Sequence, residues 1–118
     1  MSFKEDNLIQ KKTFEFALSI IKFYTDCKSQ NEFILSKQIL RCGTSIGANV
    51  EEAIAAQSKK DFISKLSIAN KEARETKYWL KLYQNSNLVQ IEIEIYLKEI
   101  ESIINILTKI IKTSSENL

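Results

Sequence analysis

The sequence contains no proline and no histidine, and only two of its 118 residues are glycine. Glycine supplies most of the positive-φ backbone positions on which tight turns between strands depend, so this composition argues against an all-β architecture. The absence of histidine removes the commonest general base and a common metal ligand. The composition therefore favours helices over strands and a binding or structural protein over an enzyme.

The two cysteines, Cys27 and Cys42, lie in apolar stretches and have no Cys-x-x-Cys spacing. This arrangement predicts two buried free thiols in a reducing cytoplasm and disfavours a disulfide or a metal site. Residues 2–12 are charged throughout, unlike a targeting segment. No uncharged apolar run reaches the ~18 residues that a membrane span needs. We therefore expect a cytoplasmic protein with no membrane contact, no metal and no cofactor.

Apolar residues recur at steps of three and four in four segments, which is the period of amphipathic helices. We predict helices over residues 5–28, 35–56, 59–84 and 89–112 of a single domain, 1–118. The polar connections between them are short, and short connections join antiparallel neighbours. The predicted fold is all-α, an up-down-up-down antiparallel four-helix bundle.

Polar residues offer candidate caps for two of the predicted helix starts. Ser58 is a candidate N-cap for the third helix, with Asp61 completing a variant of the capping box. The second helix has two candidates, Ser36 or the residues just before Phe33. Residues 89–95 alternate with period two, but a lone strand has no partner, so we predict that the fourth helix begins at Val89.

Several predicted helices carry a second apolar stripe, which would form a surface of the size typical of interfaces. On the third helix this stripe lies opposite a core stripe that runs from Phe62 to Tyr83. The alternative is a single broad core in a chain rich in isoleucine. Self-association is the favoured reading, through six residues that we expect to face outward: Phe16, Ile20, Phe23, Ile68, Trp79 and Leu82.

Gly43 and Gly47 are four residues apart on the predicted second helix. Glycines at this spacing leave a strip without side chains, where another helix can approach closely. A phosphate-binding loop needs a preceding strand and more glycine. We therefore assign both to helix packing, together with Asn49, which we expect to be a buried hydrogen-bonding residue that fixes register.

The total charge is small, with 17 basic and 15 acidic residues giving +2, but its distribution is uneven. Residues 57–84 hold seven basic and three acidic residues, a net +4. The helical period puts the acidic residues on one side and most of the basic residues on the other. The basic flank predicts either contact with a nucleic-acid backbone or solubilising and intersubunit pairing, and it comprises Lys59, Lys60, Lys71, Arg74, Lys77 and Lys81.

The acidic residues offer no catalytic arrangement. Glu51 and Glu52 are adjacent and so point in different directions on a helix, and no Glu-x-x-His pair exists for a di-metal bundle site. Glu72 and Glu75 share a face, where we expect them to pair with lysines at helical spacing. We predict no catalytic residue and no enzyme activity.

The middle of the chain also carries a family resemblance. The segments Leu40-Arg-Cys-Gly-Thr-Ser-Ile-Gly-Ala-Asn-Val-Glu-Glu52, Gln57-Ser-Lys-Lys-Asp-Phe62 and Ile68-Ala-Asn-Lys-Glu-Ala-Arg-Glu-Thr-Lys-Tyr-Trp-Leu80 resemble the four-helix-bundle proteins encoded in intervening sequences of bacterial 23S rRNA genes. The resemblance implies a homopentameric ring of antiparallel bundles. A related branch, the accessory protein of diversity-generating retroelements, works with nucleic acid, but it is strongly basic and is a poor match to this chain.

Two functions remain open at this point. The first is a non-enzymatic oligomeric scaffold with weak, salt-sensitive affinity for RNA or DNA. The second is a ring that engages another protein and no nucleic acid.

Overall fold

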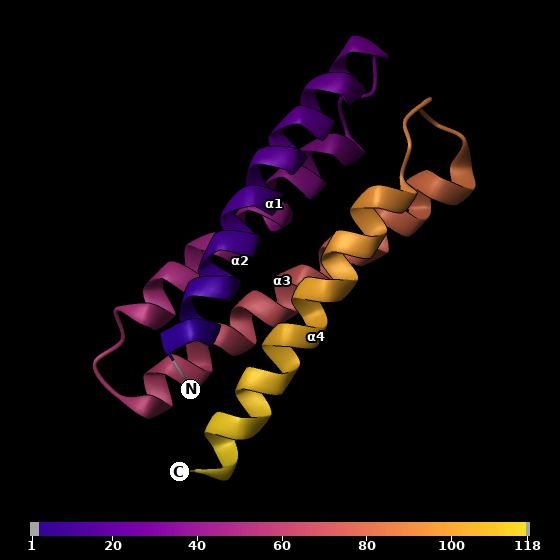
Figure 1. Cartoon of the computed structure of the whole chain (residues 1–118). Coiled ribbons are helices and arrows are strands. Elements are labelled where there is room, and N and C mark those ends of the chain that lie inside the picture. The colour runs from indigo at the N-terminus through magenta and orange to yellow at the C-terminus, as the bar shows by residue number, and fades with distance from the viewer. Residues whose placement is uncertain (1–2, 118) are drawn as a thin grey trace.

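The computed structural model describes residues 3–117, with side chains from residue 8 onward. Its regular elements are four α-helices: α1 (Phe3–Ser29), α2 (Leu35–Ile54), α3 (Lys59–Ser86) and α4 (Glu94–Glu116). Successive helices run antiparallel, and the start of α1 and the end of α4 lie at the same end of the molecule (Figure 1). The predicted all-α bundle with up-down-up-down topology is confirmed.

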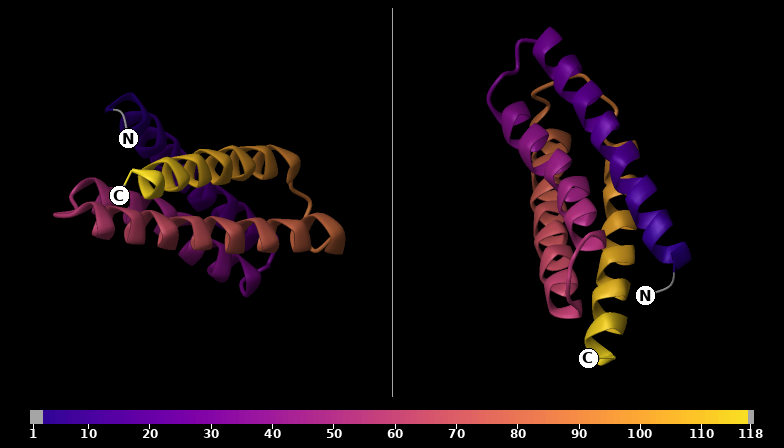
Figure 2. Two further views of the ribbon diagram at one scale, coloured as in Figure 1. Left: turned by 90° about the horizontal axis from the view of Figure 1, so that it is seen from below. Right: turned by 90° about the vertical axis from the view of Figure 1, so that its left-hand side faces the viewer.

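The helices form two hairpins that pack side by side into a rod of 47 × 21 × 20 Å. Helix α2 packs closely against both α1 and α3, and α3 packs against α4, whereas α1 and α4 make the weakest contact among the neighbouring helix pairs. The views in Figure 2 show the rod from two further sides. A groove consequently remains between α1 and α4, lined by Ser19, Lys22, Asp26, Tyr96 and Glu99 among others.

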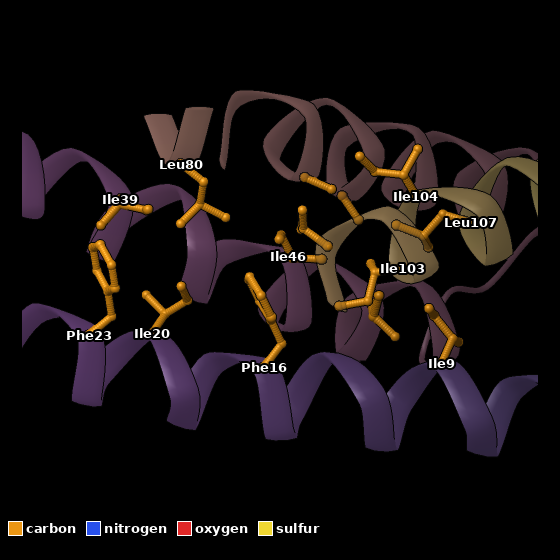
Figure 3. Close-up of a cluster of buried hydrophobic side chains, with 14 of the residues drawn as sticks. Ile9, Phe16, Ile20, Phe23, Ile39, Ile46, Leu80, Ile103, Ile104 and Leu107 are labelled. Atoms are coloured by element: carbon orange, nitrogen blue, oxygen red, sulfur yellow. The ribbon is translucent and has the colours of Figure 1, made fainter. Parts of the chain in front are cut away.

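The core consists of one apolar stripe from each helix. On α3 the regular stripe predicted from the sequence is buried from Leu66 to Tyr83, and Phe62 at its start is partly buried against the core. On α1 the buried stripe contains Phe16, which is 1% exposed, and runs from Ile9 to Cys27. Figure 3 shows this stripe directed toward side chains of the other helices: Ile9, Phe16, Ile20 and Phe23 face Ile39, Ile46, Leu80, Ile103, Ile104 and Leu107.

The expected outward orientation of Phe16, Ile20 and Phe23 is therefore wrong. The opposite stripe of α1 faces outward instead, with Phe14 63%, Leu18 54% and Ile21 47% exposed. Both stripes are apolar and both have helical spacing, so periodicity alone does not choose between them. The buried stripe is the longer one, because Ile9 and Thr13 extend it toward the start of α1.

The link between α3 and α4 corrects a second expectation. Residues 87–93 form a connection without helix or strand, and α4 begins at Glu94 rather than at Val89. Val89 and Ile93 are only 8% and 6% exposed, while Gln90 and Glu92 face solvent. The period-two pattern thus reflects a connecting segment with one side on the bundle, which needs no partner strand. The second helix also ends at Ile54, before the expected residue 56.

Glycine is scarce, and polar residues cap or end several of the helices. The Ser58 hydroxyl accepts the Asp61 N–H at 3.0 Å, as its N-cap position predicts. Asn31 and Asn87 take left-handed backbone conformations, with φ of 64° and 56°, in the turns that follow α1 and α3. Asparagine tolerates this conformation better than other non-glycine residues, so these two positions replace the usual helix-ending glycine.

Candidate interaction surfaces

The six basic residues predicted as one flank all lie on α3. Lys60, Lys71, Arg74 and Lys81 are exposed, and none of them forms an ion pair with a carboxylate of the described side chains. Lys59 is also exposed, and its Nζ donates to the backbone oxygen of Asn117 at 3.1 Å. We call these five residues and Lys77 the basic flank of α3.

Lys77 differs from the rest of the basic flank, because it is half-buried and paired. Its Nζ lies 2.6 Å from Oε2 of Glu101 on α4. The hydrogen bond from Lys77 holds the pKa of Glu101 below its ordinary value, and the charges of Arg74 and Lys81 act in the same direction. Glu101 therefore lies within the field of three cations of the basic flank.

This ion pair is one rung of a polar ladder along the seam between α3 and α4. The rungs repeat every seven residues on both helices, the spacing at which side chains return to the same side of a packed helix pair. We call this arrangement the α3–α4 ladder. Its rungs join Gln84 to Glu94 at 3.0 Å, Lys77 to Glu101 at 2.6 Å, and Asn70 to Thr108 at 3.3 Å.

The acidic flank of α3 faces the opposite neighbour, α2. Arg41 of α2 pairs with Glu72 at 3.4 Å and also with Glu75. Trp79 donates its indole N–H to the Glu75 carboxylate at 3.0 Å. The expectation that Glu72 and Glu75 pair with lysines of their own helix is wrong, because α2 places a guanidinium within reach of both. The acidic flank of α3 thus meets a cation of α2, and the basic flank meets a carboxylate of α4.

Apolar side chains are exposed at several places on the surface, including the α1–α2 turn at Phe33 and Ile34 and the start of α4 at Ile95. On α1, Phe14, Leu18 and Ile21 form an outward stripe, which we call the α1 outer stripe. Beside it, a shallow groove between α1 and α2 is lined by Phe14, Ala17 and Ala48 among others. The three predicted interface residues of α3 lie elsewhere: Ile68 is exposed, and Trp79 and Leu82 are half-buried.

The two glycines of α2 lie where α1 crosses closest. A Cβ added to Gly43 would come within 2.9 Å of Ile20 Cγ2, and one added to Gly47 within 3.3 Å of the Thr13 carbonyl oxygen. Asn49 is partly buried but donates to Ser45 of its own helix at 2.9 Å. It therefore makes no register-fixing bond to a neighbouring helix in the described structure.

A buried carboxylate, which sequence reasoning did not single out, closes the turn between α1 and α2. Glu32 accepts the backbone N–H groups of Ile34 and Leu35 on one oxygen and that of Ser36 on the other, at 2.8–3.0 Å. The Tyr83 hydroxyl of α3 donates to the same carboxylate at 2.6 Å. Glu32 thus caps α2, as the segment just before Phe33 allowed, and ties this turn to α3.

Burial alone raises the pKa of Glu32, but the hydrogen bonds from Tyr83 and from the three backbone N–H groups outweigh it and lower the pKa below its ordinary value. Burial, followed by the bond to Glu32, raises the pKa of Tyr83, so its hydroxyl remains a donor. All four hydrogen-bond donors to the Glu32 carboxylate are groups of the folded chain itself. We read the cluster as a structural cap.

Both cysteines are buried and unpaired. Burial raises the pKa of Cys27 and of Cys42 to about 11, which keeps them as thiols near neutral pH and makes them poor nucleophiles. Within the part of the chain that the structure describes, no three metal-ligating side chains come together. None of the described helices combines the length and apolarity required to cross a bilayer.

Comparisons with known proteins found one matching family and a similar solved structure. A family described as the 23S rRNA-intervening sequence protein matches residues 5–109 of the chain. The crystal structure of a protein with unknown function from the S23 ribosomal protein family of Bacteroides thetaiotaomicron VPI-5482 is similar, with a TM-score of 0.87 and 47% sequence identity. The match covers 92% of this chain and 98% of that one. The comparison with curated proteins found no match.

Proposed function

This chain belongs to the 23S rRNA-intervening sequence protein family, and we propose that it is a non-enzymatic, self-associating bundle that binds the phosphate backbone of RNA or DNA through α3. The observation that carries the proposal is the basic flank, where Lys60, Lys71, Arg74 and Lys81 are exposed without a carboxylate partner among the described side chains. Such a row of cations along one helix suits a row of phosphates.

The expected binding is directed to the backbone and not to the bases. Tyr78 is the aromatic side chain exposed on this side of α3, and a single aromatic gives little base stacking. Binding should then be weak, insensitive to sequence and steeply dependent on salt, because each neutralised phosphate releases counterions. Self-association would repeat the basic flank around a symmetry axis and enlarge the cationic surface.

Self-association is supported by the α1 outer stripe, where Phe14, Leu18 and Ile21 lie one helical turn apart and are about half exposed or more. An exposed apolar row of this kind is typical of a surface that another protein covers. We propose a second copy of the chain as that protein and a pentamer as the assembly, the number that the family resemblance implies. The cytoplasm is the proposed location.

Nucleic-acid binding is tested by filter-binding titrations at low and moderate salt with an RNA hairpin and a DNA hairpin. A triple variant of the basic flank should lower the slope of log affinity against log salt by about 2.7, since each lost phosphate contact contributes ~0.9. A control triple removes three exposed lysines of the α1–α2 hairpin and should change the slope little. The two variants are Lys71→Gln/Arg74→Gln/Lys81→Gln and Lys22→Gln/Lys28→Gln/Lys37→Gln.

Self-association is tested by sedimentation. Wild-type protein should exceed the 13.6 kDa of the monomer, and Leu18→Glu should shift it toward the monomer by burying a charge in the apolar contact. Leu88→Glu changes an equally exposed leucine in the α3–α4 connection and serves as the control. A wild-type monomer at micromolar concentration would contradict the assembly.

A second candidate function is a protein-binding ring with no nucleic-acid ligand. The α1 outer stripe favours it, because an apolar surface on the side away from α3 recognises protein rather than phosphate. If neither hairpin is retained at low salt while the protein sediments as an oligomer, this second function is preferred.

A further inference from the structure

The cations of the basic flank are not equivalent. Arg74 and Lys81 lie one helical turn to either side of Lys77 and are exposed. Lys77 lies at the centre of this row, and its ammonium group is held by Glu101 at 2.6 Å. The central cation of this row is therefore paired with a carboxylate that belongs to α4.

We infer that Glu101 is an internal competitor for phosphate, which occupies Lys77 in the free protein and yields it when a nucleic-acid backbone docks on α3. This inference rests on the proposed nucleic-acid binding. Carboxylate and phosphate oxygens accept the same charge-assisted hydrogen bonds from ammonium and guanidinium groups. A phosphate at this position would reach Lys77 and the two flanking cations together.

The ion pair between Lys77 and Glu101 can exchange with a competing anion. The side chains of Lys77 and Glu101 are 36% and 47% exposed, and ion pairs at this exposure contribute little net stability. The three cations around Glu101 lower its pKa, so it remains a charged competitor at neutral pH. A weak, charged and exchangeable partner reduces affinity for phosphate without abolishing it.

The competing explanation is purely structural, because Lys77 and Glu101 also form a rung of the α3–α4 ladder. The two explanations differ in what removal of the carboxylate does. A structural rung affects stability, and its loss changes nucleic-acid affinity only through the removed negative charge, equally in the presence and the absence of Lys77. An internal competitor, once neutralised, releases Lys77 and increases both the affinity and its dependence on salt.

The deciding measurement is fluorescence anisotropy with labelled RNA and DNA hairpins over a range of salt concentrations. Glu101→Gln should bind both hairpins roughly three- to fivefold more tightly at low salt, the range expected when an exposed ion pair no longer competes. Its slope of log affinity against log salt should steepen by ~0.9, one further phosphate contact. Glu99→Gln is the matched control, since it makes the same charge change on α4 beside the α1–α4 groove.

A double-mutant comparison locates the effect at Lys77. In the wild type, Lys77→Gln should weaken binding less than Arg74→Gln does, because Glu101 already occupies the lysine. In the Glu101→Gln background, the two substitutions should weaken binding about equally. Thermal melts of each variant would show that the fold is retained.

Each outcome decides between the claims. If the wild type binds through the basic flank but Glu101→Gln and Glu99→Gln behave alike, the competitor role of Glu101 is refuted and the proposed function stands. If neither the wild type nor Glu101→Gln binds either hairpin at low salt, both claims fall. If Glu101→Gln alone binds, the competition is stronger than we expect, and the inference is supported.

Discussion

The two hairpins of the bundle are held together by different physical means. Where α1 meets α2, glycines allow the helices to approach, and Glu32 closes the turn with three backbone hydrogen bonds while a fourth, from Tyr83, ties the turn to α3. Where α3 meets α4, a ladder of partly exposed polar pairs follows the seam and a non-helical connection closes the end. Both hairpins share the apolar core, but the first adds close helix packing and buried polar groups at its seam, whereas the second adds exchangeable surface contacts.

The two hairpins also differ in the surfaces that they present to solvent. The α1–α2 hairpin presents the apolar α1 outer stripe, whereas the α3–α4 hairpin presents the basic flank and its acidic partner Glu101. A rigid apolar surface suits a permanent contact between copies, and an exchangeable charged surface suits a transient, salt-sensitive ligand. Substitutions in the first hairpin should accordingly cost more stability than substitutions along the ladder.

The largest effect is expected for Phe16→Ala, which empties a core position that is 1% exposed. Truncation of a buried phenylalanine costs ~3–5 kcal/mol of unfolding free energy. Phe14→Ala, two residues earlier on the same helix and 63% exposed, should change monomer stability by no more than ~0.5 kcal/mol. Chemical denaturation of dilute protein measures both, and equal costs would contradict the assignment of the two stripes.

Glu32→Gln should be the next most damaging change, at ~2 kcal/mol, because hydrogen bonds to a charged group contribute more than neutral ones. The folded pKa of Glu32 is lowered, so its stabilising contribution is complete above the unfolded value of ~4.3 and is lost as pH falls through the folded value. Denaturation at several pH values tests this.

The Glu32→Gln variant should lose less stability than the wild type as the pH falls below that unfolded value. Tyr83→Phe is the matched control, because it removes one of the four bonds and leaves the charge in place, and we expect it to cost less. A wild-type pH profile that Glu32→Gln leaves unchanged would show that this carboxylate does not carry the acid sensitivity.

Gly43→Ala tests the close approach of α1 and α2. Alanine favours a helix over glycine by ~1 kcal/mol, but its Cβ would lie within 2.9 Å of Ile20 Cγ2, and overpacking typically costs ~1–3 kcal/mol. We expect a net loss of ~1 kcal/mol. Gly47→Ala, whose Cβ meets its nearest atom at 3.3 Å, should be less harmful. A stabilised Gly43→Ala variant would argue that the helices do not meet so closely.

The smallest effect is expected on the ladder. Glu101→Gln should change the unfolding free energy only slightly, because its ion pair with Lys77 is substantially exposed and screened by solvent. Thermal melts at low and high salt provide the measurement, and the difference from wild type should vanish at high salt. A loss as large as that of Glu32→Gln would remove the contrast between the two hairpins.

Much of the candidate site was visible in the sequence, but its partners were not. The uneven charge of residues 57–84 placed the basic flank on one helix, and Ser58 marked where that helix begins. Helical periodicity does not indicate which neighbour lies against which flank. Arg41 and Glu101 therefore emerged as partners only once α2 and α4 were positioned.

Because periodicity does not identify packing neighbours, the sequence also led to two wrong predictions, the outward stripe of α1 and the start of α4. Phe16 and Phe14 lie on two apolar stripes of one helix, and only packing against the other three helices shows which is buried. Val89 and Ile93 fit a helix, a strand or an extended link equally well by composition. In the folded protein both side chains pack against the end of the bundle, and the segment between them forms a connection and not a helix.

The helical content, the number of helices, their antiparallel order and the segregation of charge on α3 could all be derived from the residues alone, because they follow from local periodicity, connection length and residue type. Packing was needed to establish which stripe of α1 is buried, which carboxylate meets Lys77 and how Glu32 is satisfied. Each of these depends on residues far apart in the chain, and a contact between them exists only after the helices have packed.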